Sequence, residues 1–131
     1  MWKMIILLPC MFFLASCGSG NKNEPPAEPV YRRISAREAH EMMHEGKAFI
    51  LLDVRTGEEF QESRIPGAIN IPDFEIGNRA ESELPDKNAL ILVYCRSGRR
   101  SEGAARELVA LGYTNVYDFG GIVDWSFEIE K

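Results

Sequence analysis

The sequence predicts one α/β domain with a mainly parallel sheet and helices on both of its faces. Residues 49–54 and 90–94 are continuous apolar runs without polar alternation, which is typical of strands buried on both faces of a parallel sheet. Segments with helical start signals lie between and after these runs. Such an alternation of strands and helices predicts parallel strands joined by crossover helices.

Three helices are expected from local signals. A capping box at 35–38 starts a helix that runs to about residue 45, with Gly46 as its stop. A second, short helix begins at Thr56 and reaches about Glu62. The third covers 99–111, and Gly112 follows it as a cap. The apolar residues of this third helix lie mostly on one face: Ala104, Ala105, Leu108, Val109 and Leu111.

The rest of the domain carries weaker signals. Residues 68–71 and 115–117 are expected to be strands, and 73–83 is either irregular or helical. Gly120-Gly121 is expected to form a turn, followed by a last short helix around Trp125, which we interpret as a core anchor.

Length and charge limit the classes of function. The 131 residues suffice for one compact domain plus a leader. A formal net charge of -5 argues against a general nucleic-acid binder. His40 and His44 share one predicted helix without a third ligand nearby, so we interpret them as surface residues and expect no metal site.

Residues 1–17 have the pattern of an export signal. Lys3 precedes an apolar stretch, 4–13, that is too short to span a membrane. The string Leu14-Ala15-Ser16-Cys17 resembles a bacterial lipobox, whose cysteine is diacylated and becomes the new N-terminus. We therefore expect Cys17 to carry lipid and the protein to be anchored in the bacterial cell envelope, on the extracytoplasmic side.

Two alternatives remain for this leader: an ordinary secretory signal with an incidental cysteine, and a retained membrane anchor. Residues 18–30 are rich in Gly, Ser, Asn and Pro and are expected to form a flexible linker. The domain then covers 31–131 and holds a single thiol, Cys95, because the other cysteines lie in the leader.

Chemistry is expected at Cys95, directly after the strand 90–94. A loop of Arg96, Ser97 and Gly98 follows and leads into the helix that starts with Arg99 and Arg100. Loop N–H groups, the positive helix N-terminus and the arginines all favour the nucleophilic thiolate. An inert buried cysteine with solvated arginines is the structural alternative.

These residues resemble the rhodanese family. Cys95 to Ser101 is similar to the family's active-site loop, which begins with cysteine and has arginine at its sixth position. Asp53-Val54-Arg55 resembles the first family signature, 65–72 the second, and Gly120-Gly121 with Trp125 the closing one. The resemblance spans about residues 34–126. In one departure, Arg64 stands where the family often has histidine.

The resemblance implies a sulfurtransferase that needs no metal or organic cofactor. Cys95 would take sulfur from an anionic donor such as thiosulfate and hold it as a persulfide among the N–H groups of Arg96 to Arg100. Cyanide or a thiol would then accept the sulfur. Oligomeric state is left open.

Three further residues have possible supporting roles. Asp53 ends a strand beside the site, but we favour a structural role in which it holds backbone groups of a neighbouring loop and Arg55 pairs with Glu59. Arg64 either reaches the mouth of the pocket or, as we favour, is solvated.

Two other functions compete with sulfur transfer. A cysteine-based phosphatase or arsenate reductase needs Cys-x5-Arg, whereas Arg100 gives Cys-x4-Arg and a smaller loop. A non-catalytic binding module of the same architecture is the other alternative, and the complete loop argues against it.

Overall fold

The computed structural model describes residues 30–131, so the predicted leader with Cys17, and the linker up to residue 29, lie outside the described residues. In the described part, five strands form one sheet in the order β1-β5-β4-β2-β3, and every pairing is parallel. The α/β prediction is confirmed. The strands are β1 (Arg32–Arg33), β2 (Ile50–Asp53), β3 (Ile69–Asn70), β4 (Ile91–Cys95) and β5 (Val116–Gly121).

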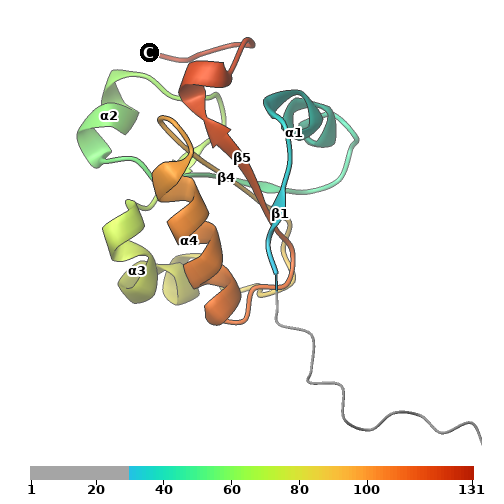
Figure 1. Cartoon of the computed structure of the whole chain (residues 1–131), viewed down its shortest axis with the longest axis vertical. Coiled ribbons are helices and arrows are strands. Elements are labelled where there is room, and N and C mark those ends of the chain that lie inside the picture. Colours follow the sequence, from blue (N-terminus) through green and yellow to red (C-terminus); the bar gives the residue numbers. More distant parts are fainter. Residues whose placement is uncertain (1–29) are drawn as a thin grey trace, which may run out of the picture.

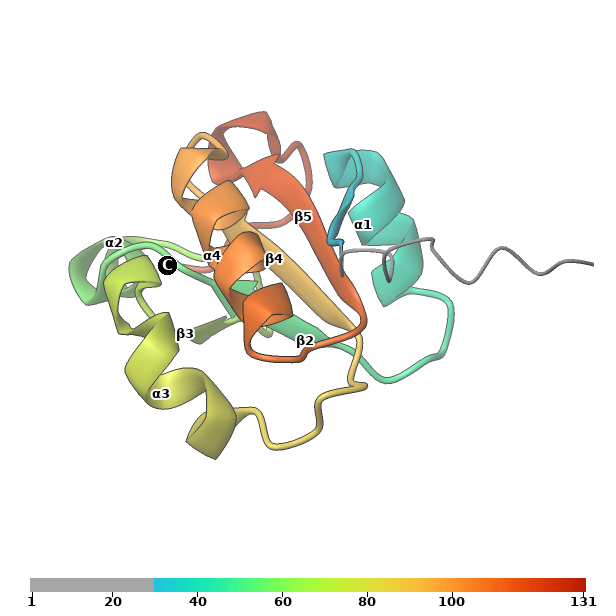
Figure 2. The same ribbon diagram turned by 60° about the horizontal axis from the view of Figure 1, so that its bottom comes forward.

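Helices cover both faces of the sheet. They are α1 (Ala36–Met43), α2 (Gly57–Glu62), α3 (Ile76–Glu83) and α4 (Arg99–Ala110), with 3-10 turns η1 (Asp73–Glu75) and η2 (Ile122–Asp124). Figure 1 shows α1 on one side of the strands and α3 and α4 on the other, and the rotated view in Figure 2 agrees. Between residues 30 and 131, no helix has the length and apolar character needed to cross a membrane.

The apolar runs of β2 and β4 divide their side chains between two cores. Leu52 and Val93 belong to the core beneath α3 and α4. Their neighbours Leu51 and Leu92 belong to the core on the α1 side. Because successive side chains of a strand point to opposite faces, a strand buried on both faces needs apolar residues throughout.

Reciprocal side-chain caps fix where α1 and α2 begin. The Glu38 N–H donates to Ser35 Oγ at 3.1 Å, and the Ser35 N–H donates to the Glu38 carboxylate at 2.7 Å. Thr56 and Glu59 make the same arrangement at α2. Both predicted helix starts are confirmed, whereas α1 ends at Met43, two residues before the expected end.

The structure also differs from the sequence predictions. The edge strand β1 was not predicted, and the segment 73–83 is helical, in η1 and α3. Gly120-Gly121 is not a separate turn but the end of β5, which is longer than expected. Trp125 follows η2 instead of lying within a helix.

Candidate active site

Cys95 lies at the centre of the carboxyl edge of the sheet. It is the last residue of β4, and not the first residue after the strand as expected. It pairs with Gly121 of β5. Asp53 ends β2 on the other side. Ligands of open parallel sheets bind at this edge. Cys95 is only 1% exposed.

The loop after Cys95 curls back so that an amide points at the sulfur. The Gly98 N–H donates to Cys95 Sγ at 3.0 Å. Gly98 has φ +103°, a left-handed conformation that favours glycine. Helix α4 begins at the next residue, and its positive N-terminal end adds to this polar environment. Burial therefore comes with an oriented donor, and apolar packing does not seal the thiol on every side.

The end of β5 supports the other side of the loop. A Cβ on Gly121 would overlap the carbonyl oxygen of Arg96 and lie 2.6 Å from Ser97 Cα. The Val123 N–H donates to that same Arg96 carbonyl at 3.2 Å. Only a residue without a side chain at Gly121 lets the Cys95 loop lie this close to the strand.

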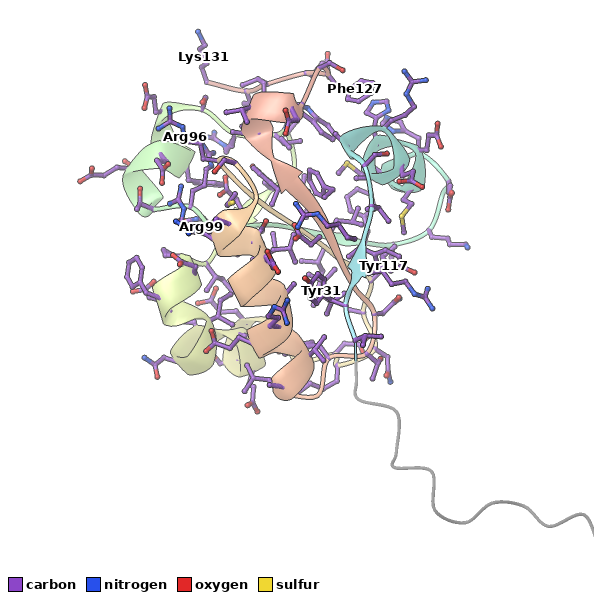
Figure 3. All side chains as sticks on the ribbon, in the orientation of Figure 1. Tyr31, Arg96, Arg99, Tyr117, Phe127 and Lys131 are labelled. Atoms are coloured by element: carbon purple, nitrogen blue, oxygen red, sulfur yellow. The ribbon has the colours of Figure 1, made fainter. Side chains whose placement is uncertain are left out.

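The three loop arginines have different surroundings. Arg96 and Arg99 are exposed, and Figure 3 shows both on the side of the molecule toward α2, away from α1. Arg100 is half-buried and forms a two-point ion pair with Glu59, with contacts of 2.7 and 3.0 Å. The hydrogen bonds from Arg100 lower the pKa of Glu59 to about 2.

Asp53 and Arg55 form a buried ion pair with each other. Arg55 Nη2 lies 2.7 Å from Asp53 Oδ2, and both side chains are at least 95% buried. Arg55 also donates to the Ser63 carbonyl at 2.6 Å, while Asp53 accepts from the Arg55 backbone N–H. The expected Arg55–Glu59 pair is therefore wrong, because Glu59 faces Arg100. The Asp53 carboxylate accepts from the backbone and the guanidinium of Arg55, and not from backbone groups of a neighbouring loop as expected.

Arg64 is directed toward the C-terminal segment. It donates to the Phe60 carbonyl at 3.2 Å, and its Nε lies 3.4 Å from a carboxylate oxygen of Glu130. The backbones of Arg64 and Glu130 also pair as an antiparallel bridge. The side chain is thus held by protein groups and is not fully solvated as we favoured.

The two histidines and Trp125 lie on the α1 side of the sheet. His44 is exposed, whereas His40 is partly buried and stacks on Phe127 with ring centres 3.7 Å apart. In residues 30–131, no three His, Cys, Asp or Glu side chains gather in a way that would hold a metal ion. Trp125 is 9% exposed and packs against Phe119, which confirms the core anchor.

Two acidic residues beside the loop were missed as site residues. Glu59 appeared in the sequence as a cap of α2 and as a partner for Arg55. Asp118, fully buried in β5, accepts from Ser101 Oγ at 2.7 Å beneath the start of α4. The sequence feature that could have pointed to Asp118 is an acidic residue within an otherwise apolar strand, because a buried carboxylate requires partners.

Comparison with known proteins shows the family of this chain. The profile of the rhodanese-like domain family matches residues 35–128. The Escherichia coli (strain K12) thiosulfate sulfurtransferase PspE is 44% identical over 73 residues, which are 56% of this chain and 70% of PspE. The Arabidopsis thaliana chloroplastic thiosulfate sulfurtransferase 16 is 36% identical over 71% of this chain and 85% of its own length.

A larger relative and a solved structure extend the comparison. The Candida albicans adenylyltransferase and sulfurtransferase UBA4 is 38% identical over 76% of this chain, but the chain spans only 24% of that protein. A structure of a rhodanese with anions from E. coli aligns with a TM-score of 0.60 and 40% identity, covering 64% of this chain and 99% of the other. The family profile, the sequence relatives and the structural neighbour agree with one another, and the chain belongs to the rhodanese-like domain family.

Proposed function

We propose that this protein transfers sulfane sulfur from an anionic donor such as thiosulfate to cyanide or a thiol, through a persulfide on Cys95. The observation that carries the proposal is the Gly98 N–H, which points at Cys95 Sγ from 3.0 Å. A hydrogen bond from an oriented backbone donor stabilises sulfur more as an anion than as a neutral thiol. After transfer, the N–H groups of the loop from Arg96 to Arg100 would hold the outer sulfur of the persulfide.

The reaction proceeds in two displacements. The Cys95 thiolate attacks the outer sulfur of thiosulfate, the sulfur–sulfur bond of the donor breaks, and sulfite leaves with the bonding electron pair. Cyanide or a thiolate then attacks the outer sulfur of the persulfide, which releases thiocyanate or an acceptor persulfide and restores the Cys95 thiolate. Splitting the transfer in this way is covalent catalysis, and charges balance in each step without a redox partner.

The exposed guanidinium groups of Arg96 and Arg99 support the proposal that the sulfur donor is an anion. Both stand at the loop that encloses the sulfur. In a chain with net charge -5, they form a local positive patch that attracts a dianion such as thiosulfate.

The ion pair of Arg100 argues against a phosphatase. An oxyanion-wrapping arginine must direct its two-pronged guanidinium at the substrate. Here both prongs of Arg100 contact the carboxylate of Glu59. The Cys-x4-Arg spacing also leaves the loop one residue shorter than Cys-x5-Arg. Sulfur transfer, which needs only one sulfur atom to enter the loop, fits better.

Intact mass after incubation with thiosulfate tests the proposal. We expect the protein to gain one sulfur atom, cyanide to remove it with release of thiocyanate, and Cys95→Ser to abolish the gain. Absence of any gain with thiosulfate and other sulfane-sulfur donors would favour a non-catalytic binding module. Cys95-dependent hydrolysis of an aryl phosphate would favour the phosphatase.

We also propose that the domain is tethered to a membrane of the bacterial cell envelope through lipid on Cys17. The lipobox-like string Leu14-Ala15-Ser16-Cys17 supports this proposal. Expression in a bacterium with labelled fatty acid should label the wild-type protein and place it in the membrane fraction. Cys17→Ala should lose both the label and the membrane fractionation, and equal membrane recovery of this variant would contradict lipid anchoring.

A further inference from the structure

Behind the Cys95 loop, Asp118 and Ser101 form a buried polar pair that the sulfur chemistry does not require directly. Both residues are 0% exposed. Asp118 Oδ1 accepts from Ser101 Oγ at 2.7 Å and from the Gly120 N–H at 2.9 Å. A carboxylate buried at no exposure costs folding free energy unless it is well partnered, so its position calls for an explanation.

Ser101 contacts Gly98, the residue whose backbone amide binds the sulfur of Cys95. The Ser101 hydroxyl has one proton, and Asp118 Oδ1 at 2.7 Å and the Gly98 carbonyl oxygen at 3.1 Å share it in a three-centre hydrogen bond. The N–H of the same Gly98 donates to Cys95 Sγ. Asp118 holds the Ser101 hydroxyl in the orientation in which its shared proton also reaches the Gly98 carbonyl, and the left-handed Gly98 presents its N–H to the sulfur. The side chains of Asp118 and Ser101 thus connect β5, through Gly98, to Cys95 Sγ.

The other oxygen of Asp118 is directed toward Arg33 on the edge strand. Asp118 Oδ2 is buried and has no hydrogen-bond partner, and Arg33 Nη1 lies 3.7 Å from it. Arg33 also lies 3.9 Å from Glu102 of α4, and its Nη2 is 3.2 Å from where a Cβ on Gly98 would be. Arg33 therefore balances the Asp118 charge from behind the turn.

We propose that Asp118 is a positioning residue for Cys95, acting through Ser101 to hold the Gly98 N–H on the sulfur. The inference rests on the proposed function only in taking Cys95 as the reacting group. Asp118 touches neither the sulfur nor a substrate. Its negative charge alone would oppose ionisation of a nearby thiol, so positioning and charge predict opposite effects when the carboxylate is removed.

Charged groups on both sides of Cys95 Sγ can affect the pH at which the thiol ionises. Arg33, Asp118 and Glu102 stand behind the turn, and Arg100 with Glu59 stands at the start of α4. Substitutions at Asp118 and Ser101 leave Arg100 and Glu59 unchanged. A change in sulfur ionisation therefore comes from the braced turn or from the Asp118 charge.

The test is the pH dependence of Cys95 alkylation by iodoacetamide, measured on the Cys95 peptide by mass spectrometry after reaction of the full chain. For D118A and S101A we expect the midpoint of the rate profile to move up by about one pH unit, a loss of about tenfold in rate at pH values below the midpoint. D118N keeps an oxygen acceptor for Ser101, so its midpoint should stay at or below that of the wild type. V116A, on the same strand and buried in the core, is the control for general loss of stability.

The alternatives give distinct results. A midpoint that falls in D118A would show that the charge dominates and would overturn the positioning role. Unchanged midpoints in D118A and S101A, with only the loss of stability that V116A also shows, would reduce the pair to a structural element. A D118N profile that rises with D118A would exclude Oδ1 as the orienting acceptor. If D118A does not fold, S101A and D118N still decide. Because alkylation needs no sulfur donor, each of these results stands whether or not thiosulfate loads Cys95.

Discussion

Glu59 and Arg100 lie 41 residues apart in the sequence and meet beside the Cys95 loop in a two-point ion pair. Glu59 also caps α2, since its Oε2 accepts from the Thr56 N–H at 2.9 Å. One carboxylate therefore fixes the start of α2 and holds the first turn of α4. The contact joins two crossover helices at the edge of the sheet where Cys95 lies.

Breaking this ion pair should lower stability without removing the nucleophile. We expect E59Q and R100M each to reduce the free energy of unfolding by about 1–2 kcal/mol, because a half-buried, charge-assisted hydrogen bond is lost in both. The double variant E59Q/R100M should lose less than the sum of the two. Urea unfolding of all four proteins gives the coupling between the residues, and simple additivity would mean that the pair contributes nothing.

The same pair should produce a defined loss of stability in acid. The pKa of Glu59 falls from its ordinary 4.5 to about 2 when the chain folds, chiefly because of the hydrogen bond from Arg100. A lowered folded-state pKa gives stability that is present above pH 4.5 and is lost as the pH falls toward 2. Urea midpoints measured across this range should fall more steeply in the wild type than in E59Q. Parallel curves would contradict a lowered pKa at this carboxylate.

Elements with a local cause could be predicted from the sequence. The strands β2 and β4 are short apolar runs buried on both faces, and two capping boxes mark α1 and α2. The edge strand β1 could not be predicted, because two exposed arginines carry no strand pattern and become a strand only by pairing with β5.

The candidate site divides in the same way. The loop after Cys95 is contiguous in the chain, so its glycine, its arginines and the following helix could be interpreted together. The partners of Arg100 and Ser101 could not, since Glu59 and Asp118 reach them only through the packing of separate elements. A sequence shows that Glu59 can cap a helix, but not which cation its carboxylate faces across the fold.

The buried Asp53–Arg55 pair should matter for folding more than for sulfur chemistry. We expect R55M to lower the free energy of unfolding by about 3–5 kcal/mol, because it leaves the Asp53 carboxylate buried without its cation. D53N/R55M removes both charges and should recover part of that loss. Urea unfolding measures both effects, and thiosulfate loading of the folded fraction should remain. A folded R55M that cannot be loaded would instead assign the pair a role in the reaction.

Gly121 should be the position in β5 least tolerant of a side chain, because its Cβ would overlap the Arg96 carbonyl of the Cys95 loop. Arg96 cannot move aside cheaply, since the contact is with backbone that also accepts the Val123 N–H. G121A should therefore displace the loop. We expect Cys95 to lose most of its thiosulfate loading and about tenfold in alkylation rate at pH values below the midpoint of its rate profile, because the Gly98 hydrogen bond is lost. G57A is a matched control, because a Cβ at this first residue of α2 meets only Asn70 Oδ1 at an ordinary 3.8 Å. Wild-type loading in G121A would mean that the loop can move away from β5 and still bind the sulfur. The support that we assign to the end of this strand would then be wrong.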